Sequence, residues 1–259
     1  MKIILLLLTW VRSPRYEGSV DALVDSACRE AEIYLNAGLD SVMLENMHDV
    51  PYVQPRNQGP EVVAALTKIA SAVKSVLPQN LPVGIQVLAG ANKEALAVGY
   101  ACGLDFTRAE GFVFSHIGDE GTFDACAGEL LRYRRNLGAQ DILVLTDIKK
   151  KHSSHAITAD LDVNEVAKAA EFFLSDGVII TGTATGDPPN AQQVKDVKKS
   201  VSIPVLVGSG VTTENVGDFM TADALIVGSH FKSEGLWSNS ICKERTMRFM
   251  EKVNNLRSR

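Results

Sequence analysis

Two short apolar segments near the C-terminus each run directly into glycine, and this pattern constrains the fold more than any other feature. The first segment is residues 204–211 and the second is residues 224–229. A glycine after a strand lets backbone N–H groups approach an anion, because no Cβ stands in the way. Such turns after strands seven and eight form the phosphate site of many (β/α)8 barrels. The residues expected to bind phosphate are Gly208, Ser209, Gly210, Gly228 and Ser229.

Strand-like apolar runs alternate with helix-like periodicity along the whole chain, which is typical of βαβ units and a parallel sheet. Strands are expected at 3–8, 41–44, 83–88, 105–107, 142–146, 178–181, 205–207 and 224–227. Helices are expected near 20–36, 60–76, 93–102, 123–137, 163–174, 191–199, 213–220 and 238–256. Eight strand–helix pairs in 259 residues predict one TIM barrel over residues 1–259, since such a barrel takes about 250 residues. The alternative is a doubly wound open sheet, whose glycine motif usually follows the first strand.

The composition excludes some classes of partner. The chain is 46% hydrophobic and 22% charged with a net charge of −5, which is ordinary for a globular protein with a sizeable core. It has no basic block with interleaved aromatic residues, so nucleic acid is not an expected partner. The four cysteines have no CxxC spacing, which indicates reduced thiols of a cytoplasmic protein. A homo-oligomer is compatible with the sequence, but nothing in the sequence sets its size.

The N-terminal segment has two interpretations. Lys2 followed by the apolar residues 3–8 resembles the start of a signal peptide, but the run is short and residues 10–12 form a poor cleavage site. We favour a buried first strand. The run is far shorter than the roughly 20 residues that a membrane helix needs, so no transmembrane span is expected.

Polar side chains follow the expected strands at the barrel end where active sites lie. Carboxylates near lysine or arginine shift one another's pKa and share proton transfer. We therefore select Glu45, Asp147 and Lys149 for acid–base or Schiff-base chemistry, and Arg108 to neutralise charge. The alternative is a rim of salt bridges. Further candidates at this end are Asn46, Gln86, Glu110, His152, Thr181, Thr183 and Thr185.

The histidines do not form a recognisable metal motif. His48, His152 and His155 have carboxylates nearby, but no HxH or HExxH spacing supports a divalent metal. We assign no metal ligand, and the cofactor stays undetermined. His230, just past Gly228, is expected either to face the phosphate or to begin a helix.

Several segments in order along the chain carry a resemblance to a known family. They are 13–16 (SPRY), 45–52 (ENMHDVPY), 106–110 (FTRAE), 130–134 (LLRYR), 147–152 (DIKKKH), 177–189 (GVIITGTATGDPP) and 208–211 (GSGV). Together they resemble the BtpA/SgcQ family over nearly the whole chain from residue 13. The resemblance implies a barrel of the ribulose-phosphate-binding type, and it transfers no catalytic residue. Residues 2–11 lack the histidine and glycine that usually end the family's first strand, which leaves the contribution of that strand to the site undecided.

These observations favour an enzyme that acts on a small phosphorylated metabolite, either a sugar phosphate or a nucleotide. A phosphosugar lyase or isomerase and a phosphate-ester or nucleotide hydrolase both fit. One branch of the BtpA/SgcQ family is linked to photosystem I accumulation, so a non-catalytic assembly or stability factor is the alternative. A third interpretation is a structural subunit that retains a vestigial site.

Overall fold

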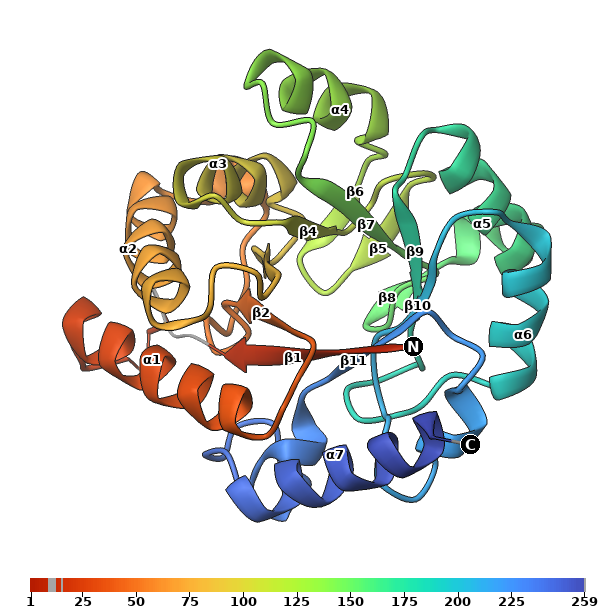
Figure 1. Cartoon of the computed structure of the whole chain (residues 1–259). Helices are drawn as coiled ribbons and strands as arrows, with labels where there is room; N and C mark the ends of the chain where they lie inside the picture. Colours follow the sequence, from red (N-terminus) through yellow and green to blue (C-terminus); the bar gives the residue numbers. More distant parts are fainter. Residues whose placement is uncertain (9–12, 15, 259) are drawn as a thin grey trace.

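Parallel strands close into a barrel at the centre of the molecule (Figure 1). The computed structural model describes residues 1–8, 13–14 and 16–258, with no side-chain description for residues 5–8. The barrel strands in the order of their pairing are β1 (Lys2–Leu8), β11 (Ala224–Val227), β10 (Val205–Val207), β9 (Gly177–Ile180), β7 (Leu143–Ile148), β4 (Phe106–Ala109), β3 (Val83–Gln86) and β2 (Ser41–Glu45). Strand β1 pairs with both β2 and β11, which closes the barrel. The predicted (β/α)8 fold is confirmed.

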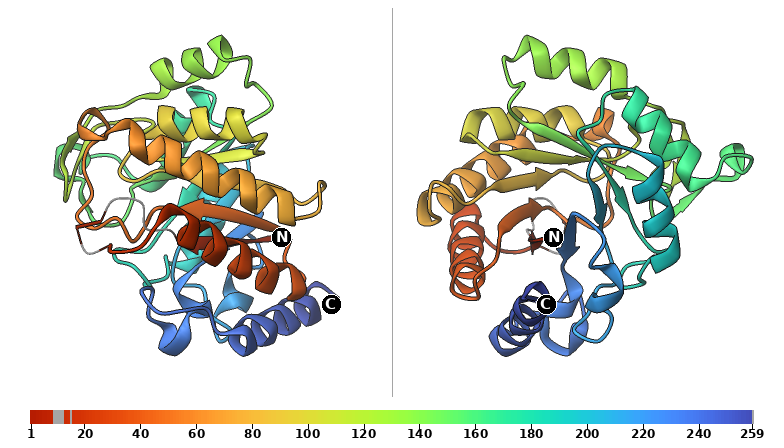
Figure 2. Two further views of the ribbon diagram at one scale, coloured as in Figure 1. Left: turned by 90° about the vertical axis from the view of Figure 1, so that its left-hand side faces the viewer. Right: turned by 45° about the vertical axis from the view of Figure 1, so that its right-hand side comes forward.

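Helices surround the barrel, as the views in Figures 1 and 2 show. They are α1 (Val20–Asn36), α2 (Pro60–Val76), α3 (Asn92–Cys102), α4 (Ala127–Asn136), α5 (Val163–Phe172), α6 (Ala191–Ser200) and α7 (Lys243–Arg257). Helix α5 begins with a capping box, in which Asp162 accepts from the Glu165 N–H and Glu165 accepts from the Asp162 N–H. Among the helices that the structure describes, none has the length and apolar character needed to span a membrane.

The barrel interior is a separate apolar layer inside the ring of strands. Its buried members are Ile4, Met43, Phe106, Leu145, Ile179, Leu206, Ala224 and Ile226. Gly84 in β3 makes room for the Phe106 ring, because a Cβ at Gly84 would stand 2.2 Å from a ring carbon. A second, larger apolar layer fills the space between strands and helices.

Four aspartates stabilise the opposite, amino-terminal end of the barrel in the same way. Each immediately precedes a strand, and its carboxylate accepts a hydrogen bond from a backbone N–H near the start of the preceding strand. The pairs are Asp40 with Ile3, Asp105 with Val83, Asp176 with Val144, and Asp223 with Val205, at 2.7–2.8 Å. Each carboxylate also pairs with a basic side chain, such as Arg134 beside Asp176. The same hydrogen bond between an aspartate and a backbone N–H therefore recurs at every second strand of the barrel.

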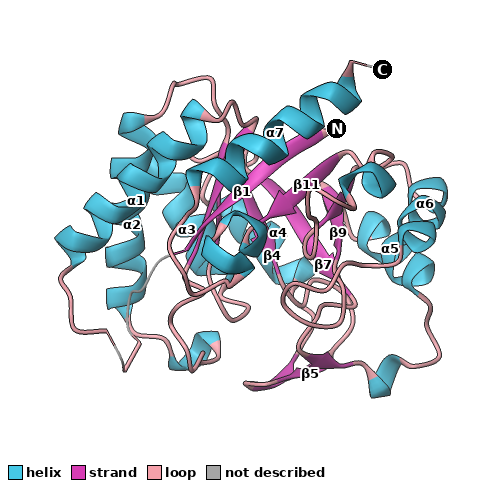
Figure 3. Ribbon diagram, turned by 90° about the horizontal axis from the view of Figure 1, so that it is seen from below, coloured by secondary structure: helices cyan, strands magenta, loops and turns pink. Residues whose placement is uncertain are grey.

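The long loops carry a second, antiparallel sheet that the sequence did not predict. It consists of β5 (His116–Gly118), β6 (Gly121–Phe123) and β8 (Ser153–Ser154). Figure 3 shows β5 at the end of the molecule opposite the N-terminus, beyond the carboxyl ends of the barrel strands. The expected helix from residue 123 is therefore wrong at its start, and α4 begins at Ala127.

Two other expected helices differ from the structure. The helix expected at 213–220 is a single 3-10 turn, η3 (Val216–Phe219). The last helix begins at Lys243 and not near residue 238, because the preceding loop folds back on itself: Cys242 N–H donates to Phe231 O and Ser233 N–H donates to Ser240 O. That loop also contains the short turns η4 (Ser229–Phe231) and η5 (Ser233–Gly235). Further 3-10 turns are η1 (Pro55–Asn57) and η2 (Ala156–Thr158).

Candidate functional site

A cavity of about 400 Å³ opens at the carboxyl ends of the barrel strands. Glu45, Arg108 and Asp147 line it, and each lies two residues after an apolar member of the barrel interior. Because alternate strand residues face the same side, a strand that buries Met43, Phe106 or Leu145 inward also directs the later polar residue inward. Gln86 and Glu110 line the same wall. Five of the residues selected from the sequence therefore meet in one cavity.

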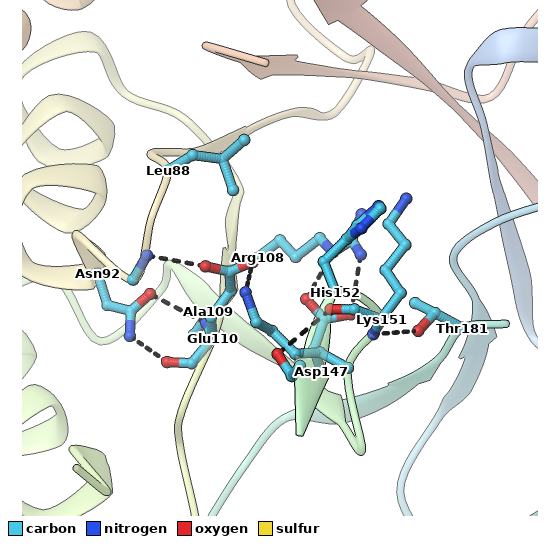
Figure 4. A network of polar contacts seen from close by, with 12 residues as sticks. Leu88, Asn92, Arg108, Ala109, Glu110, Asp147, Lys151, His152 and Thr181 are labelled. Atoms are coloured by element: carbon cyan, nitrogen blue, oxygen red, sulfur yellow. Dashed lines mark hydrogen bonds and ion pairs between the residues drawn. The ribbon is translucent and has the colours of Figure 1, made fainter. Parts of the chain in front are cut away.

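The floor of the cavity contains a buried ion pair between Arg108 and Asp147 (Figure 4). Arg108 Nε donates to Asp147 Oδ2 at 2.9 Å, and Nη2 donates to Oδ1 at 2.8 Å. Both side chains are buried, so burial opposes the charge on Arg108, but Asp147 outweighs it and raises the arginine's pKa. This two-bond geometry fixes the orientation of both groups.

Three consecutive lysines at the end of β7 have three different environments. Lys149 has a left-handed backbone (φ 47°), and its amine donates to Thr158 O at 2.8 Å, away from the cavity. The Lys150 amine pairs with Glu110 Oε1 at 3.1 Å. Lys151 lines the cavity, and among the described residues its amine has neither a hydrogen bond nor an ion pair. The lysine in the cavity is thus Lys151, whereas the sequence had suggested Lys149.

Glu45 and Lys151 have pKa values displaced toward one another. Burial raises the pKa of the Glu45 carboxyl, although Arg108 and Lys151 oppose this shift. Burial lowers the pKa of the Lys151 amine, and the charge of Arg108 lowers it further. Buried groups with shifted pKa values in a cavity are candidates for proton transfer.

A hairpin formed by β5 and β6 covers one side of the cavity with Asp119 and Glu120. Gln54 anchors it, since its Nε2 donates to Glu120 O at 2.9 Å and to Thr122 O at 3.1 Å. Below the hairpin, Glu110 Oε2 accepts from Gly90 N–H at 2.8 Å, which joins the loops after β3 and β4. These contacts hold the acidic wall of the cavity in place.

The glycine turns form the opposite wall, with residues 208–212 from the β10 loop and residues 228–230 from the β11 loop. The Gly208 N–H donates to Ile180 O at 2.8 Å and is therefore used within the sheet. Gly210 has φ +67°, and a Cβ there would stand 2.1 Å from Pro188 N, so only glycine fits. In the described part of the chain, the N–H groups of Ser209, Gly210, Val211, Ser229 and His230 donate to no protein acceptor.

Basic side chains lie behind these turns. Arg245 of α7 lines the cavity and donates from Nε to His230 O at 2.7 Å. The His230 ring also lines the cavity, and its Nε2 accepts from Thr213 N–H at 3.2 Å. His230 lies in η4, so both roles considered for it from the sequence are compatible with its position.

The remaining predicted residues have structural contacts. Asn46 Oδ1 accepts from Leu88 N–H at 2.7 Å, and the Ser209 hydroxyl donates to Asp187 O at 2.8 Å, so each joins two loops. Thr185 lines the cavity, where its hydroxyl meets His152 Nε2 at 2.9 Å. Thr181 accepts from Lys151 N–H and Thr183 donates to Asp187, and neither of these two threonines lines this cavity.

Sequence reasoning did not select Arg245, Trp237 or Tyr52, which also line the cavity. Tyr52 stands in the ENMHDVPY segment and donates from its hydroxyl to Met47 O at 2.6 Å, so that segment held a signal for it. Arg245 and Trp237 arrive from the loop and helix after β11, whose path no local pattern indicates.

The described residues contain no group of three His, Cys, Asp or Glu side chains arranged to hold a metal ion. His48 packs against Trp237 with ring centroids 5.3 Å apart, and His155 Nε2 lies 3.0 Å from Lys150 O. Arg15 and residues 10–12, which entered the sequence analysis, lie outside the described residues.

Comparison with known proteins gives the family. The sequence model of the BtpA family matches residues 4–255. The chain belongs to the BtpA family. It is 33% identical to the photosystem I biogenesis protein BtpA of Synechocystis, over 92% of this chain and 82% of that protein. It is 46% identical to an uncharacterized mitochondrial protein of Caenorhabditis elegans, over 92% of this chain and 87% of that one. The resemblance read from the sequence is confirmed.

Solved structures with this fold include several enzymes. Phosphoribosyl anthranilate isomerase from Thermus thermophilus aligns with a TM-score of 0.61 at 11% identity, covering 99% of this chain and 100% of that one. Thiamine phosphate pyrophosphorylase from Pyrococcus furiosus aligns with a TM-score of 0.59 at 12% identity, covering 98% and 96%. At identities this low, the similarity establishes that the BtpA-family chain has this barrel fold, and it does not transfer an activity. The expected cytoplasmic location, oligomeric state and lack of a nucleic-acid partner stay predictions.

Proposed function

We propose that this BtpA-family barrel binds a small phosphorylated metabolite, a sugar phosphate or nucleotide, and changes it by proton transfer. The observation that carries the proposal is the polarity of the cavity. The cavity is lined by backbone N–H donors from two glycine turns together with Arg245, and also by the acid–base groups Glu45 and Lys151.

The glycine wall suits a phosphate. The unused N–H groups of residues 209–211 and 229–230 provide donors on two neighbouring loops. Phosphate oxygens accept several charge-assisted hydrogen bonds at once, and a nearby arginine strengthens them. Two proteins with the same fold, phosphoribosyl anthranilate isomerase and thiamine phosphate pyrophosphorylase, support this choice by analogy of fold.

The opposite wall suits the hydroxyl-bearing end of the same ligand. Gln86 is buried, and its Oε1 has no hydrogen-bond partner among the described residues. Glu110 and Glu120 add carboxylate acceptors there. A buried acceptor without a partner is costly, so a ligand hydroxyl that donates to Gln86 relieves that cost. Glu45 and Lys151 then lie where a proton can be taken from or returned to the ligand.

The test compares phosphorylated compounds with their dephosphorylated counterparts. Glycerol 3-phosphate, ribose 5-phosphate, ribulose 5-phosphate and AMP are screened against glycerol, ribose, ribulose and adenosine by thermal shift and calorimetry. At least one phosphorylated compound is expected to bind, and its dephosphorylated counterpart is not. Arg245→Gln is expected to weaken that binding at least about tenfold, since a charged hydrogen bond contributes roughly 1.5–3 kcal/mol.

The matched control is Arg248→Gln, which changes an exposed arginine on the same helix. It is expected to bind like the unaltered protein. The proposal fails if no phosphorylated compound binds, or if both arginine variants bind equally well.

An assembly factor is the second candidate function. Phe172, Phe173 and Leu174 at the end of α5 are 81%, 49% and 69% exposed, and clustered exposed apolar side chains often mark a protein contact. The similarity to the photosystem I biogenesis protein BtpA of Synechocystis also supports this candidate. In a host that depends on the protein, this candidate predicts that serine at these three positions abolishes function. It also predicts that Glu45→Gln does not.

A further inference from the structure

We propose that the ligand is the open-chain form of an aldose or ketose phosphate, and that Lys151 forms an imine with its carbonyl carbon. This inference deepens the proposed function and rests on it. The observation behind it is the position of one amine. Lys151 lines the same cavity as the glycine turns, whereas the amines of Lys149 and Lys150 are bound to protein acceptors.

The backbone holds Lys151 at this place. Left-handed residues at Lys149 and His152 turn the chain on both sides of it, with φ of 47° and 52°. The Lys151 N–H donates to Thr181 Oγ1 at 3.1 Å, which attaches this turn to the end of β9. Figure 4 shows Lys151 beside the Arg108–Asp147 pair and joined to Thr181. The amine therefore reaches the cavity from a fixed backbone.

The surroundings favour a neutral, nucleophilic amine. Asp147, in β7, is the carboxylate nearest to Lys151 along the chain, but Arg108 binds both of its oxygens. Glu110 is bound by Lys150 and by Gly90 N–H. Burial and the positive charge of Arg108 lower the pKa of Lys151. A buried lysine beside another cation is a known arrangement for a Schiff-base amine.

Glu45 lines the same cavity as Lys151, and we assign it the acid role in the reaction. The Lys151 amine attacks the carbonyl carbon, and transfer of an amine proton to the oxygen gives a carbinolamine. Glu45, whose raised pKa favours the carboxylic acid, then protonates the hydroxyl group, which leaves as water. The nitrogen lone pair forms the C=N bond, so an iminium and a Glu45 carboxylate result. No oxidant, reductant or metal takes part in this step.

The test is reductive trapping. The protein is incubated with glyceraldehyde 3-phosphate, dihydroxyacetone phosphate, ribose 5-phosphate or ribulose 5-phosphate and sodium cyanoborohydride, and adducts are mapped by peptide mass spectrometry. We expect one adduct per chain, on Lys151, with at least one of these probes. Glycerol 3-phosphate in excess is expected to suppress it, because it occupies the phosphate site and has no carbonyl.

Two lysine variants provide the comparison. Lys151→Arg keeps a positive charge but cannot form the imine, so it is expected to lose the adduct and still bind glycerol 3-phosphate. Lys149→Arg changes the lysine outside the cavity and is expected to retain the adduct. Exchange of the carbonyl oxygen with H2(18)O, a second consequence of reversible imine formation, is expected to slow at least tenfold in Lys151→Arg. Thermal melting of each variant verifies that it is folded.

The outcomes separate this inference from the proposed function. If phosphorylated compounds bind but the adduct is spread over surface lysines, or persists in Lys151→Arg, the imine is excluded and phosphate binding stands. The same holds if Lys151→Arg loses glycerol 3-phosphate binding, because Lys151 then serves as a charge for an anion. If no phosphorylated compound binds at all, both proposals fail.

Discussion

Arg108 donates two hydrogen bonds, of 2.9 and 2.8 Å, to the Asp147 carboxylate at the centre of the barrel. The pair lies next to the apolar layer inside the barrel. Phe106 belongs to that layer and precedes Arg108 by two residues, and Leu145 precedes Asp147 in the same way. It occupies both oxygens of a carboxylate that otherwise stands closest to Lys151 along the chain. The ion pair thus has a structural role and also keeps Asp147 from serving as the counterion of the Lys151 amine.

Breaking this pair is expected to destabilise the protein strongly. Asp147→Asn leaves a buried guanidinium without its charge partner, and such changes typically cost about 3–5 kcal/mol. Urea unfolding measures the loss. The double variant Arg108→Met with Asp147→Leu removes both charges and is expected to recover most of it. A loss below about 1 kcal/mol for Asp147→Asn contradicts the role given to this pair.

The hairpin above the cavity is expected to depend on Gln54. Gln54→Ala removes both donors to the hairpin backbone, at Glu120 O and Thr122 O. Hydrogen exchange of residues 116–123 should then accelerate at least tenfold, while exchange of α2 stays unchanged. Affinity for the phosphorylated ligand should fall, since Asp119 and Glu120 lose their fixed position. Unaltered exchange in the hairpin shows that Gln54 does not hold it.

Much of the barrel and part of the site could be predicted from local sequence pattern. Alternation along β2, β4 and β7 places Glu45, Arg108 and Asp147 inside, because each follows an inward apolar residue by two positions. The same rule fails at Lys149, where the strand has ended and a positive φ turns the side chain away. Local periodicity carries no information on such a turn, so Lys151 could not be chosen over its neighbours.

The roles of some residues could not be predicted from the sequence, because their partners lie far away along the chain. An aspartate precedes β2, β4, β9 and β11, and this repeat at alternate strands is readable from the printed sequence. Its role is visible only when the partner N–H groups are known. Arg245 reaches the cavity from α7 through a loop folded back at Cys242, and no periodicity encodes that path.

One of these aspartates provides a test of the amino-terminal end of the barrel. Asp176→Ala leaves the Val144 N–H without its acceptor and removes the partner of Arg134. The expected loss in the free energy of unfolding is about 1–3 kcal/mol, the cost of an unsatisfied buried group. Ligand affinity should not change, because the cavity lies at the other end. Asp160→Ala, at an exposed loop position, should change neither quantity.

The pH dependence of stability is expected to reflect His116. Its ring stacks on Phe123 with centroids 5.1 Å apart, and burial, helped by Lys150 and His155, lowers its pKa from 6.5 to about 4. Between pH 6.5 and 4 the unfolded chain therefore binds more protons at this site than the folded one. The free energy of unfolding should accordingly fall as the pH is lowered through this window.

His116→Gln removes this contribution and should flatten the decline. Urea unfolding at several values from pH 7 to pH 4.5 measures the slope, and the pH 7 value separates any loss of packing from the titration. Burial also lowers the pKa of His48 to about 4, so part of the slope should remain in the single variant. The double variant with His48→Gln should flatten it further. Equal slopes in all three proteins mean that both histidines bind protons alike in the folded and unfolded chains, which is incompatible with their burial.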